Sequence, residues 1–269
     1  MIVGPITGPR VGPVVGPYPS LTQPTWTEDA TSGFAMPRTL AEWQRLLASA
    51  SLTGDPLECW DFSAASGNIT GLLAGLNLTA TAGAPALEYQ QTVAGWDASK
   101  WAGPSGDNSS GKFESTSASL PDVSTTSALL GAYVYQAAAP AATREFLALG
   151  VGVRMAARIT NTPRFQGNNG TNAATGGVDP TGSVQFVIIE INRALSRTAV
   201  YTMAEKIVPT WAATMTGKRA LLGGAGANAP RLWYRYAFEF SGAAAERSQA
   251  DIKTLMTTMA GSAPAWTPA

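Results

Sequence analysis

The chain has 269 residues, enough for one large domain or two small ones. It carries 18 basic and 18 acidic residues, and only 13% of its positions are charged. This balance argues against a protein that binds nucleic acid through a basic field. The absence of histidine and the presence of a single cysteine exclude a Ser-His-Asp triad, a histidine-ligated metal and an intrachain disulfide framework. The 28 glycines and 18 prolines predict many turns, and therefore β-structure.

Two further expectations concern membranes. The first residues, Met1–Pro5, lack the basic and apolar regions of a secretory signal peptide. No stretch of 18 uninterrupted apolar residues exists in the sequence, so no insertion into a membrane is predicted.

The first thirty residues contain a repeat in which Gly-Pro begins at positions 4, 8, 12 and 16. Collagen needs glycine at every third position, so this period of four excludes a collagen triple helix. Proline and glycine together favour an extended, polyproline-like segment without a core of its own. We interpret residues 1–30 as an anchoring arm that docks on another subunit or partner, with a flexible tail as the alternative. The residues that would make the contact are Val3, Pro5, Ile6, Pro9, Val11, Pro13, Val14, Val15, Pro17 and Tyr18.

Residues 31–54 are expected to form a short helical connector. Thr39 and Glu42 have the spacing of a capping box, in which each side chain bonds a backbone N–H at the start of a helix. Four apolar residues then fall on one face of that helix: Leu40, Trp43, Leu46 and Leu47. The pattern predicts a helix that packs its tryptophan against the main domain.

Residues 55–269 show the alternation of an antiparallel β-sandwich, separated by turns rich in Gly, Pro, Ser and Asn. The expected strands are 57–62, 76–81, 89–93, 128–136, 144–155, 184–192, 198–202, 220–222 and 232–240. Residues 159–183 are expected to be a long loop that either faces solvent or contacts another subunit.

The last expected strand alternates along its whole length. One face would carry Trp233, Arg235, Ala237 and Glu239, and the other Leu232, Tyr234, Tyr236, Phe238 and Phe240. A C-terminal helix is predicted to follow, with an apolar face of Ile252, Leu255, Met256 and Met259 and with Gly261 as its end.

Four segments resemble the concanavalin A-like (laminin G-like) jelly roll over residues 55–262. They are the run Cys59-Trp60-Asp61-Phe62-Ser63, the strands Leu221-Leu222-Gly223-Gly224 and 232–240, and the short helix that begins at Asp251-Ile252. The resemblance implies an antiparallel jelly-roll sandwich that closes with a short helix.

A chain that combines this domain with a Gly-Pro-rich arm is similar to virion-associated proteins of tailed bacteriophages, such as head decorations, fibres and tail components. It implies a non-enzymatic structural protein at the virion surface, made in the host cytoplasm. Its partners would be other virion proteins, with the chain itself a homo-oligomer and neither nucleic acid nor membrane involved.

A glycoside hydrolase on the same fold is a further alternative. Retaining relatives of that kind carry a Glu-x-Asp-x-x-Glu run that places two carboxyl groups about 5 Å apart. No such run occurs here. Glu190 is isolated in its strand, and Glu239 would pair with Arg235 on its own face. Glu58 and Asp61, three apart, would face opposite sides of a strand. We therefore predict no catalytic residues.

A lectin-like module that binds polysaccharide for adhesion to a host surface is the main alternative. Carbohydrate sites combine aromatic platforms with orienting polar groups. One loop offers both, with Trp96, Asp97, Trp101, Asp107 and Asn108 as its candidate residues. Oxygen ligands would suit Ca²⁺, but Asp107 and Asn108 alone supply too few, so no metal or cofactor is predicted. Packing of the two tryptophans at the rim of the domain is the competing interpretation.

The remaining motifs carry little chemistry. The run Gly223-Gly224-Ala225-Gly226 lacks the Lys-Ser/Thr of a phosphate-binding loop and is expected to be a turn. Cys59 lies in an apolar strand and is expected to be an inert core thiol. Lys206, Lys218 and Arg219 form no basic run.

Overall fold

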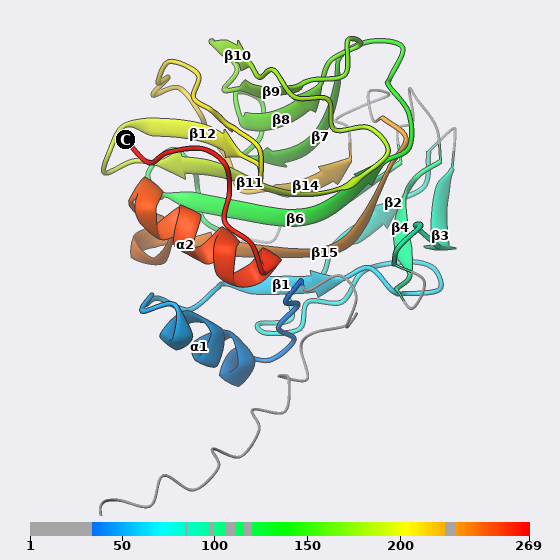
Figure 1. The fold of residues 1–269 in the computed structure, drawn as a ribbon, viewed down its shortest axis with the longest axis horizontal. Helices are drawn as coiled ribbons and strands as arrows, with labels where there is room; N and C mark the ends of the chain where they lie inside the picture. The colour runs from blue at the N-terminus through cyan, green and yellow to red at the C-terminus, as the bar shows by residue number, and fades with distance from the viewer. Residues whose placement is uncertain (1–33, 84–85, 97–98, 106–110, 116–119, 224–229) are drawn as a thin grey trace, which may run out of the picture.

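The protein is a two-sheet β-sandwich with helices on one side. The computed structural model describes residues 34–83, 86–96, 99–105, 111–115, 120–223 and 230–269. Within them, two antiparallel sheets pack face to face, and two α-helices lie against one of the sheets (Figure 1). The predicted mainly β antiparallel sandwich is confirmed, whereas its jelly-roll connectivity stays a prediction. The predicted anchoring arm, residues 1–30, lies outside the described residues.

The larger sheet has eight strands among the described residues, all paired antiparallel. Its order is β13 (Lys206–Ile207), β12 (Arg197–Tyr201), β11 (Val184–Asn192), β6 (Ala128–Gln136), β15 (Leu232–Ser241), β4 (Trp101–Pro104) and β3 (Leu87–Gln91), with β1 (Glu58–Asp61) paired to β15. We refer to it as the eight-stranded sheet.

The smaller sheet has seven strands within the same described ranges. Its order is β10 (Ala173–Thr175), β9 (Phe165–Asn168), β8 (Met155–Ile159), β7 (Arg144–Leu149), β14 (Ala220–Gly223), β5 (Lys112–Ser115) and β2 (Thr79–Thr81). We refer to it as the seven-stranded sheet.

Two expectations about strands were wrong. The single strand predicted at 144–155 is a hairpin, because Gly150 and Gly152 take positive φ angles of 98° and 69° and turn the chain. The loop predicted at 159–183 contains β9 and β10, which extend the seven-stranded sheet at its edge. Strands as short as these, FQGN and AAT, carry too little apolar alternation to be recognised from sequence.

Two apolar cores hold the layers together. Alternate residues of β6 contribute to both: Leu130 and Val134 point into the core between the sheets, whereas Leu129 and Tyr133 point to the opposite face. That opposite face is covered by α1 (Leu40–Ser49), the 3₁₀ helix η1 (Gly242–Ala245) and α2 (Gln249–Ala260). Both faces of the eight-stranded sheet are therefore buried.

Both predicted helices are present with their expected end signals. Thr39 and Glu42 form the capping box at the start of α1. Gly261 ends α2 in the left-handed conformation, with φ 70°. The apolar face of α1 places Trp43 fully buried against Phe238, with ring centroids 5.1 Å apart. The helix near the N-terminus is thus packed on the sheet as predicted.

A β-bulge in β15 changes the predicted faces of that strand. The register with β6 shifts between Tyr234 and Tyr236. Leu232 and Tyr234 therefore lie in the core between the sheets, whereas Tyr236, Phe238 and Phe240 lie in the core under the helices. The prediction that all five share one face was wrong, because one extra residue reverses the alternation beyond it.

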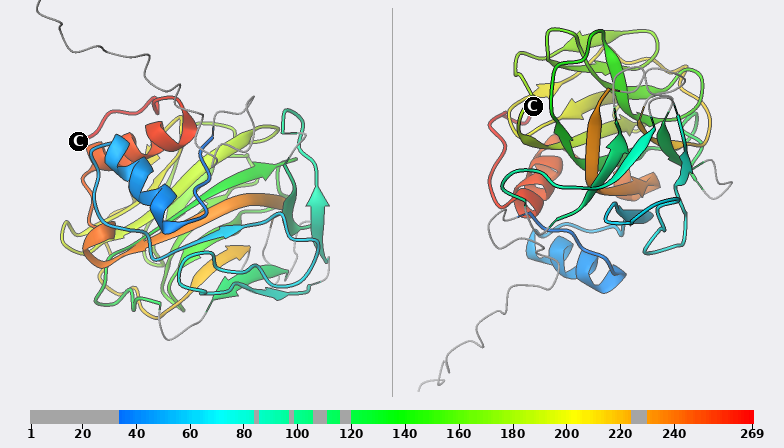
Figure 2. Two further views of the ribbon diagram at one scale, coloured as in Figure 1. Left: turned by 90° about the horizontal axis from the view of Figure 1, so that it is seen from below. Right: turned by 90° about the vertical axis from the view of Figure 1, so that its right-hand side faces the viewer.

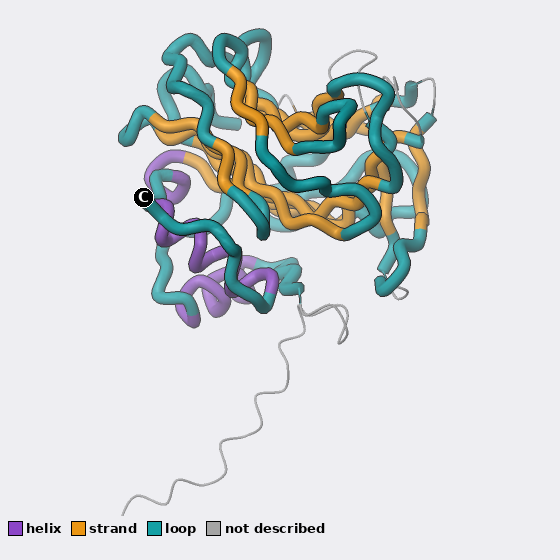
Figure 3. Tube along the Cα trace, turned by 45° about the horizontal axis from the view of Figure 1, so that its top comes forward, coloured by secondary structure: helices purple, strands orange, loops and turns teal. Residues whose placement is uncertain are grey.

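Figures 2 and 3 show the resulting order of layers: helices, eight-stranded sheet, seven-stranded sheet. Both described helices lie on the side of the eight-stranded sheet. Across the part of the chain that the structure describes, the outer face of the seven-stranded sheet carries no helix. That face carries charged side chains that are partly exposed.

Candidate functional site

The loop predicted to bind a sugar does not present its tryptophans to solvent. Trp101 is fully buried and Trp96 is 6% exposed, and their rings pack edge to face with centroids 5.3 Å apart. Both belong to the core under the helices. The other candidates of that loop, Asp97, Asp107 and Asn108, lie outside the described residues. The described part of the loop thus offers no exposed aromatic platform.

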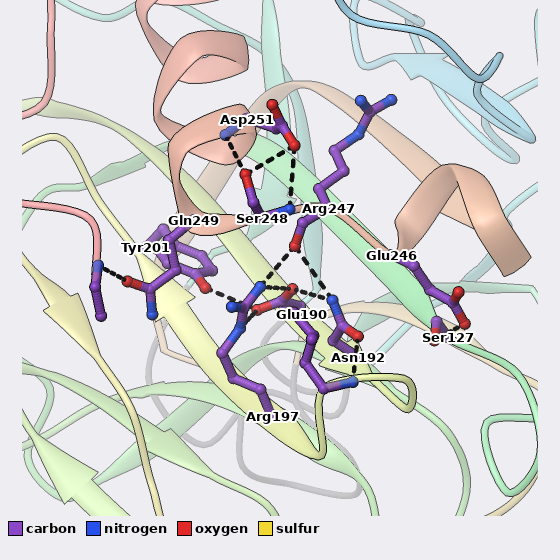
Figure 4. Close-up of polar contacts among 12 residues, drawn as sticks. Ser127, Glu190, Asn192, Arg197, Tyr201, Glu246, Arg247, Ser248, Gln249 and Asp251 are labelled. Atoms are coloured by element: carbon purple, nitrogen blue, oxygen red, sulfur yellow. Dashed lines mark hydrogen bonds and ion pairs between the residues drawn. The ribbon is translucent and has the colours of Figure 1, made fainter.

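The isolated carboxylate of β11 is the centre of a buried polar network (Figure 4). Arg197 holds Glu190 with two hydrogen bonds, from Nε at 2.8 Å and from Nη2 at 2.6 Å. The Tyr201 hydroxyl donates to the same carboxylate at 2.7 Å, and the Asn192 amide donates at 3.1 Å. The carbonyl of Arg247 accepts from Asn192 and Arg197. The network ties two strands to the segment that starts α2.

Burial closes this network to any ligand. Glu190 and Tyr201 are fully buried, and the ring of Trp266 covers Tyr201 with centroids 5.2 Å apart. Burial first, and then the charge of Glu190, raise the pKa of Tyr201 well above its ordinary value. A phenol in this state is a hydrogen-bond donor, so the group stabilises the fold.

A second pair of carboxyl groups lies where β1 meets β15. Glu58 and Glu239 are direct cross-strand partners, and both are buried. The Glu58 carboxylate accepts four backbone N–H groups, from Cys59 at 2.9 Å, Leu73 at 2.6 Å, Ala74 at 3.1 Å and Leu76 at 2.8 Å. It therefore holds the loop that follows β1. Burial and the neighbouring Glu58 raise the pKa of Glu239 to about 8.

The predicted pair of Glu239 with Arg235 was wrong. Arg235 makes an ion pair with Asp61, which also pairs with Arg38 at 2.8 Å. The bulge after Tyr234 separates Arg235 from the alternation that would place it on the face of Glu239. Cys59 lies beside this region, and burial raises the pKa of its thiol to about 11. Cys59 is therefore a buried free thiol, in agreement with the expected inert core thiol.

The outer face of the seven-stranded sheet is the candidate functional site. Strand pairing places Leu221, Ala148, Ala156 and Asn168 side by side in one row across the sheet. The first three are buried and form an apolar cluster separate from the main cores. Because they point away from the core between the sheets, the side chains around them form the surface of this face.

Those surrounding side chains are charged. They are Lys112 and Glu114 on β5, Arg219 before β14, Glu145 on β7, Arg154 before β8 and Arg158 on β8. Glu145 is held by Arg154 at 2.9 Å and lies 3.9 Å from Arg158. Glu114 lies 2.8 Å from Lys112 and 3.5 Å from Arg219. These six residues surround the row that runs from Leu221 to Asn168. We call the six residues and that row the basic face.

Four cations and two carboxylates give the basic face an excess of two positive charges. Burial lowers the pKa of Arg219, although Glu114 acts in the opposite direction. A guanidinium still stays protonated at neutral pH. The face is therefore suited to a polar ligand that carries negative charge.

No pattern along the sequence points to this face. Its cations come from separate strands and form no run along the chain, and only the pairing of β5, β14, β7 and β8 brings them together. The described residues contain no group of three or more acidic or cysteine side chains able to hold a metal ion. Neither described helix is long and apolar enough to cross a bilayer.

Comparison with solved structures supports the fold. One similar structure is Trypanosoma rangeli sialidase bound to the inhibitor DANA, with a TM-score of 0.58, 11% identity, and 77% of this chain aligned to 33% of that one. The same sialidase bound to sialic acid aligns with a TM-score of 0.57, 12% identity, and 83% and 38% coverage. The binding domain of Botulinum Neurotoxin DC in complex with SialylT aligns with a TM-score of 0.51, 13% identity, and 76% and 51% coverage.

These likenesses show a shared β-sandwich fold. The chain spans about a third of the length of the sialidase and about half of the toxin domain. No protein-family model matches the chain, and no curated protein matches it.

Proposed function

We propose that this protein is a non-catalytic binding module that holds a saccharide on its basic face. The observation that carries the proposal is the face itself, on which partly exposed charged side chains surround a buried row of apolar residues. Proteins of similar fold include a sialidase bound to sialic acid and a toxin binding domain bound to SialylT, and these likenesses favour a saccharide as the ligand.

The positions of the buried carboxyl groups favour binding over hydrolysis. Sialidases can use a tyrosine nucleophile, and Tyr201 with Glu190 has the residue types for such a pair. Both side chains are buried beneath α2 and Trp266, and Glu190 is bound by Arg197. Glu58 is occupied by four backbone N–H groups. A substrate would reach none of these groups without unfolding part of the domain.

A glycan array with the full chain tests this function, with turnover of a fluorogenic sialoside measured beside it. We expect retention on a subset of glycans and no release of the fluorophore. Failure to bind any glycan would contradict the proposal. Release of fluorophore that persists in a purified sample and disappears in Tyr201→Phe would instead support an enzyme.

Attachment to a virion is a second candidate, favoured by the Gly-Pro repeat of residues 1–30. In this proposal the arm docks on other virion proteins, the chain assembles as a homo-oligomer, and the sandwich is displayed at the virion surface. The expected result is co-sedimentation of the full chain with tailed-phage particles and loss of that association without residues 1–30. Equal association of both forms would contradict docking by the arm.

A further inference from the structure

The charges of the basic face are unequally matched. Arg154 holds Glu145 with two hydrogen bonds, from Nε at 2.9 Å and from Nη2 at 3.1 Å. Glu145 is 5% exposed, so this pair is largely shielded from solvent. Arg158 lies 3.9 Å from the same carboxylate, beyond hydrogen-bond distance. Arg154 therefore makes both hydrogen bonds described for this carboxylate, whereas Arg158 contacts it only as a longer ion pair.

The guanidinium of Arg158 has N–H donors available for a ligand. Within the described residues its guanidinium makes no hydrogen bond, and its side chain is 32% exposed. It is thus anchored on β8 and partly accessible, and it carries the positive charge that an arginine keeps in proteins. A planar guanidinium of this kind matches the two oxygens of a carboxylate.

Polar groups suited to sugar hydroxyls lie on the next strands. Arg158 faces Gln166 across the β8–β9 pair, and Gln166 faces Thr175 across the β9–β10 pair. The next row of side chains on the same face places Asn168 between Ala156 and Ala173. Amides and a hydroxyl therefore lie beside the guanidinium; the Gln166 amide donates to the Thr175 hydroxyl at 3.0 Å, and Asn168 Oδ1 accepts the Gly170 N–H at 2.9 Å. Arg158 and these five neighbours all lie on β8, β9 or β10, and we call the six residues the strip.

We infer that this strip takes a saccharide that bears a carboxylate, which pairs with Arg158 while Gln166 and Asn168 bond its hydroxyls. The inference rests on the proposed saccharide binding and adds the class of sugar and its place. The excess positive charge of the basic face would attract such an acid. A neutral sugar would gain nothing from this charge and would be bound by the amides alone.

The test is calorimetric titration of the full chain with 3′-sialyllactose, with a galacturonate trisaccharide and with lactose as the neutral sugar. We expect both acids to bind more tightly than lactose, and their affinity to fall as salt is raised. Arg158→Gln should weaken binding of the acids by roughly tenfold or more, the loss expected for a charged hydrogen bond. Arg158→Lys should recover part of it, since the charge remains without the planar fork.

Arg45→Gln is the matched control, because Arg45 is exposed on α1 on the other side of the molecule and should leave binding unchanged. Thermal unfolding of each variant checks the fold. Equal binding of acids and lactose, or full affinity in a folded Arg158→Gln, would overturn this inference and leave saccharide binding intact. Absence of binding to all three sugars and to the array would overturn both proposals.

Discussion

Glu239 lies buried with a second carboxyl group beside it, and its Oε2 atom has no hydrogen-bond partner among the described residues. Its pKa of about 8 means that the folded protein binds a proton there at pH values where the unfolded chain does not. The stability from this proton is complete below pH 4.5, the ordinary value for glutamate, and is lost as the pH rises through 8. Folding should thus weaken between pH 5 and pH 8.

Glu239→Gln is expected to flatten that dependence, because glutamine stays neutral at every pH. The wild-type free energy of unfolding should fall by up to about 1.4 kcal/mol per pH unit in this window relative to the variant. Urea unfolding at pH 5, 7 and 8.5 measures the difference. Asp55→Asn is the control, since Asp55 is exposed. Parallel curves for wild type and Glu239→Gln would show that Glu239 does not titrate in this range.

At the scale of the element, α1 depends on one side chain more than on its own helical propensity. A helix of ten residues is marginal alone, so its stability must come from packing. Trp43 supplies that packing through edge contacts with Phe238 and Phe240, at centroid distances of 5.1 and 5.5 Å.

Trp43→Ala should therefore destabilise the protein by about 3–5 kcal/mol through the cavity it leaves. Leu40→Ala, on the same helix but 45% exposed, should change stability by less than about 0.5 kcal/mol. Chemical denaturation followed by far-ultraviolet circular dichroism, which reports the backbone and not the tryptophan, measures both changes in stability. A small effect at Trp43 would mean that α1 is not part of the cooperative fold.

At the scale of the whole molecule, the two cores are built from the described residues alone. The sandwich core and the core under the helices join strands and helices from both ends of this region. Because the arm is predicted to contribute no core of its own, the domain should fold without residues 1–30.

Removal of residues 1–30 is expected to leave the circular dichroism spectrum unchanged and to shift the Tm by less than about 2 °C, which corresponds to under 1 kcal/mol for a domain of this size. Differential scanning calorimetry of both forms gives the comparison. A large fall in Tm would show that the arm packs on its own sandwich, and docking on a partner would then lose its support.

Local interactions explain which parts of the fold could be predicted. The capping box of α1 joins Thr39 to a residue three positions away, and the glycine that ends α2 acts within one turn, so both can be read along the chain. The strand 184–192 was predicted at its observed bounds, because its apolar run leaves no competing structure. The bulge in β15 could not be predicted, since it depends on the pairing with β6.

Composition and near-neighbour patterns are sufficient to exclude histidine and cysteine-cluster chemistry and to predict the β class of the domain and its two helices. Which side chains come together depends on the tertiary structure. It buried Trp96 and Trp101, placed Glu239 beside Glu58, and gathered Arg158 and Arg219 onto one face. The physical reason is that pairing of strands distant in the chain sets which side chains become neighbours and which are removed from water.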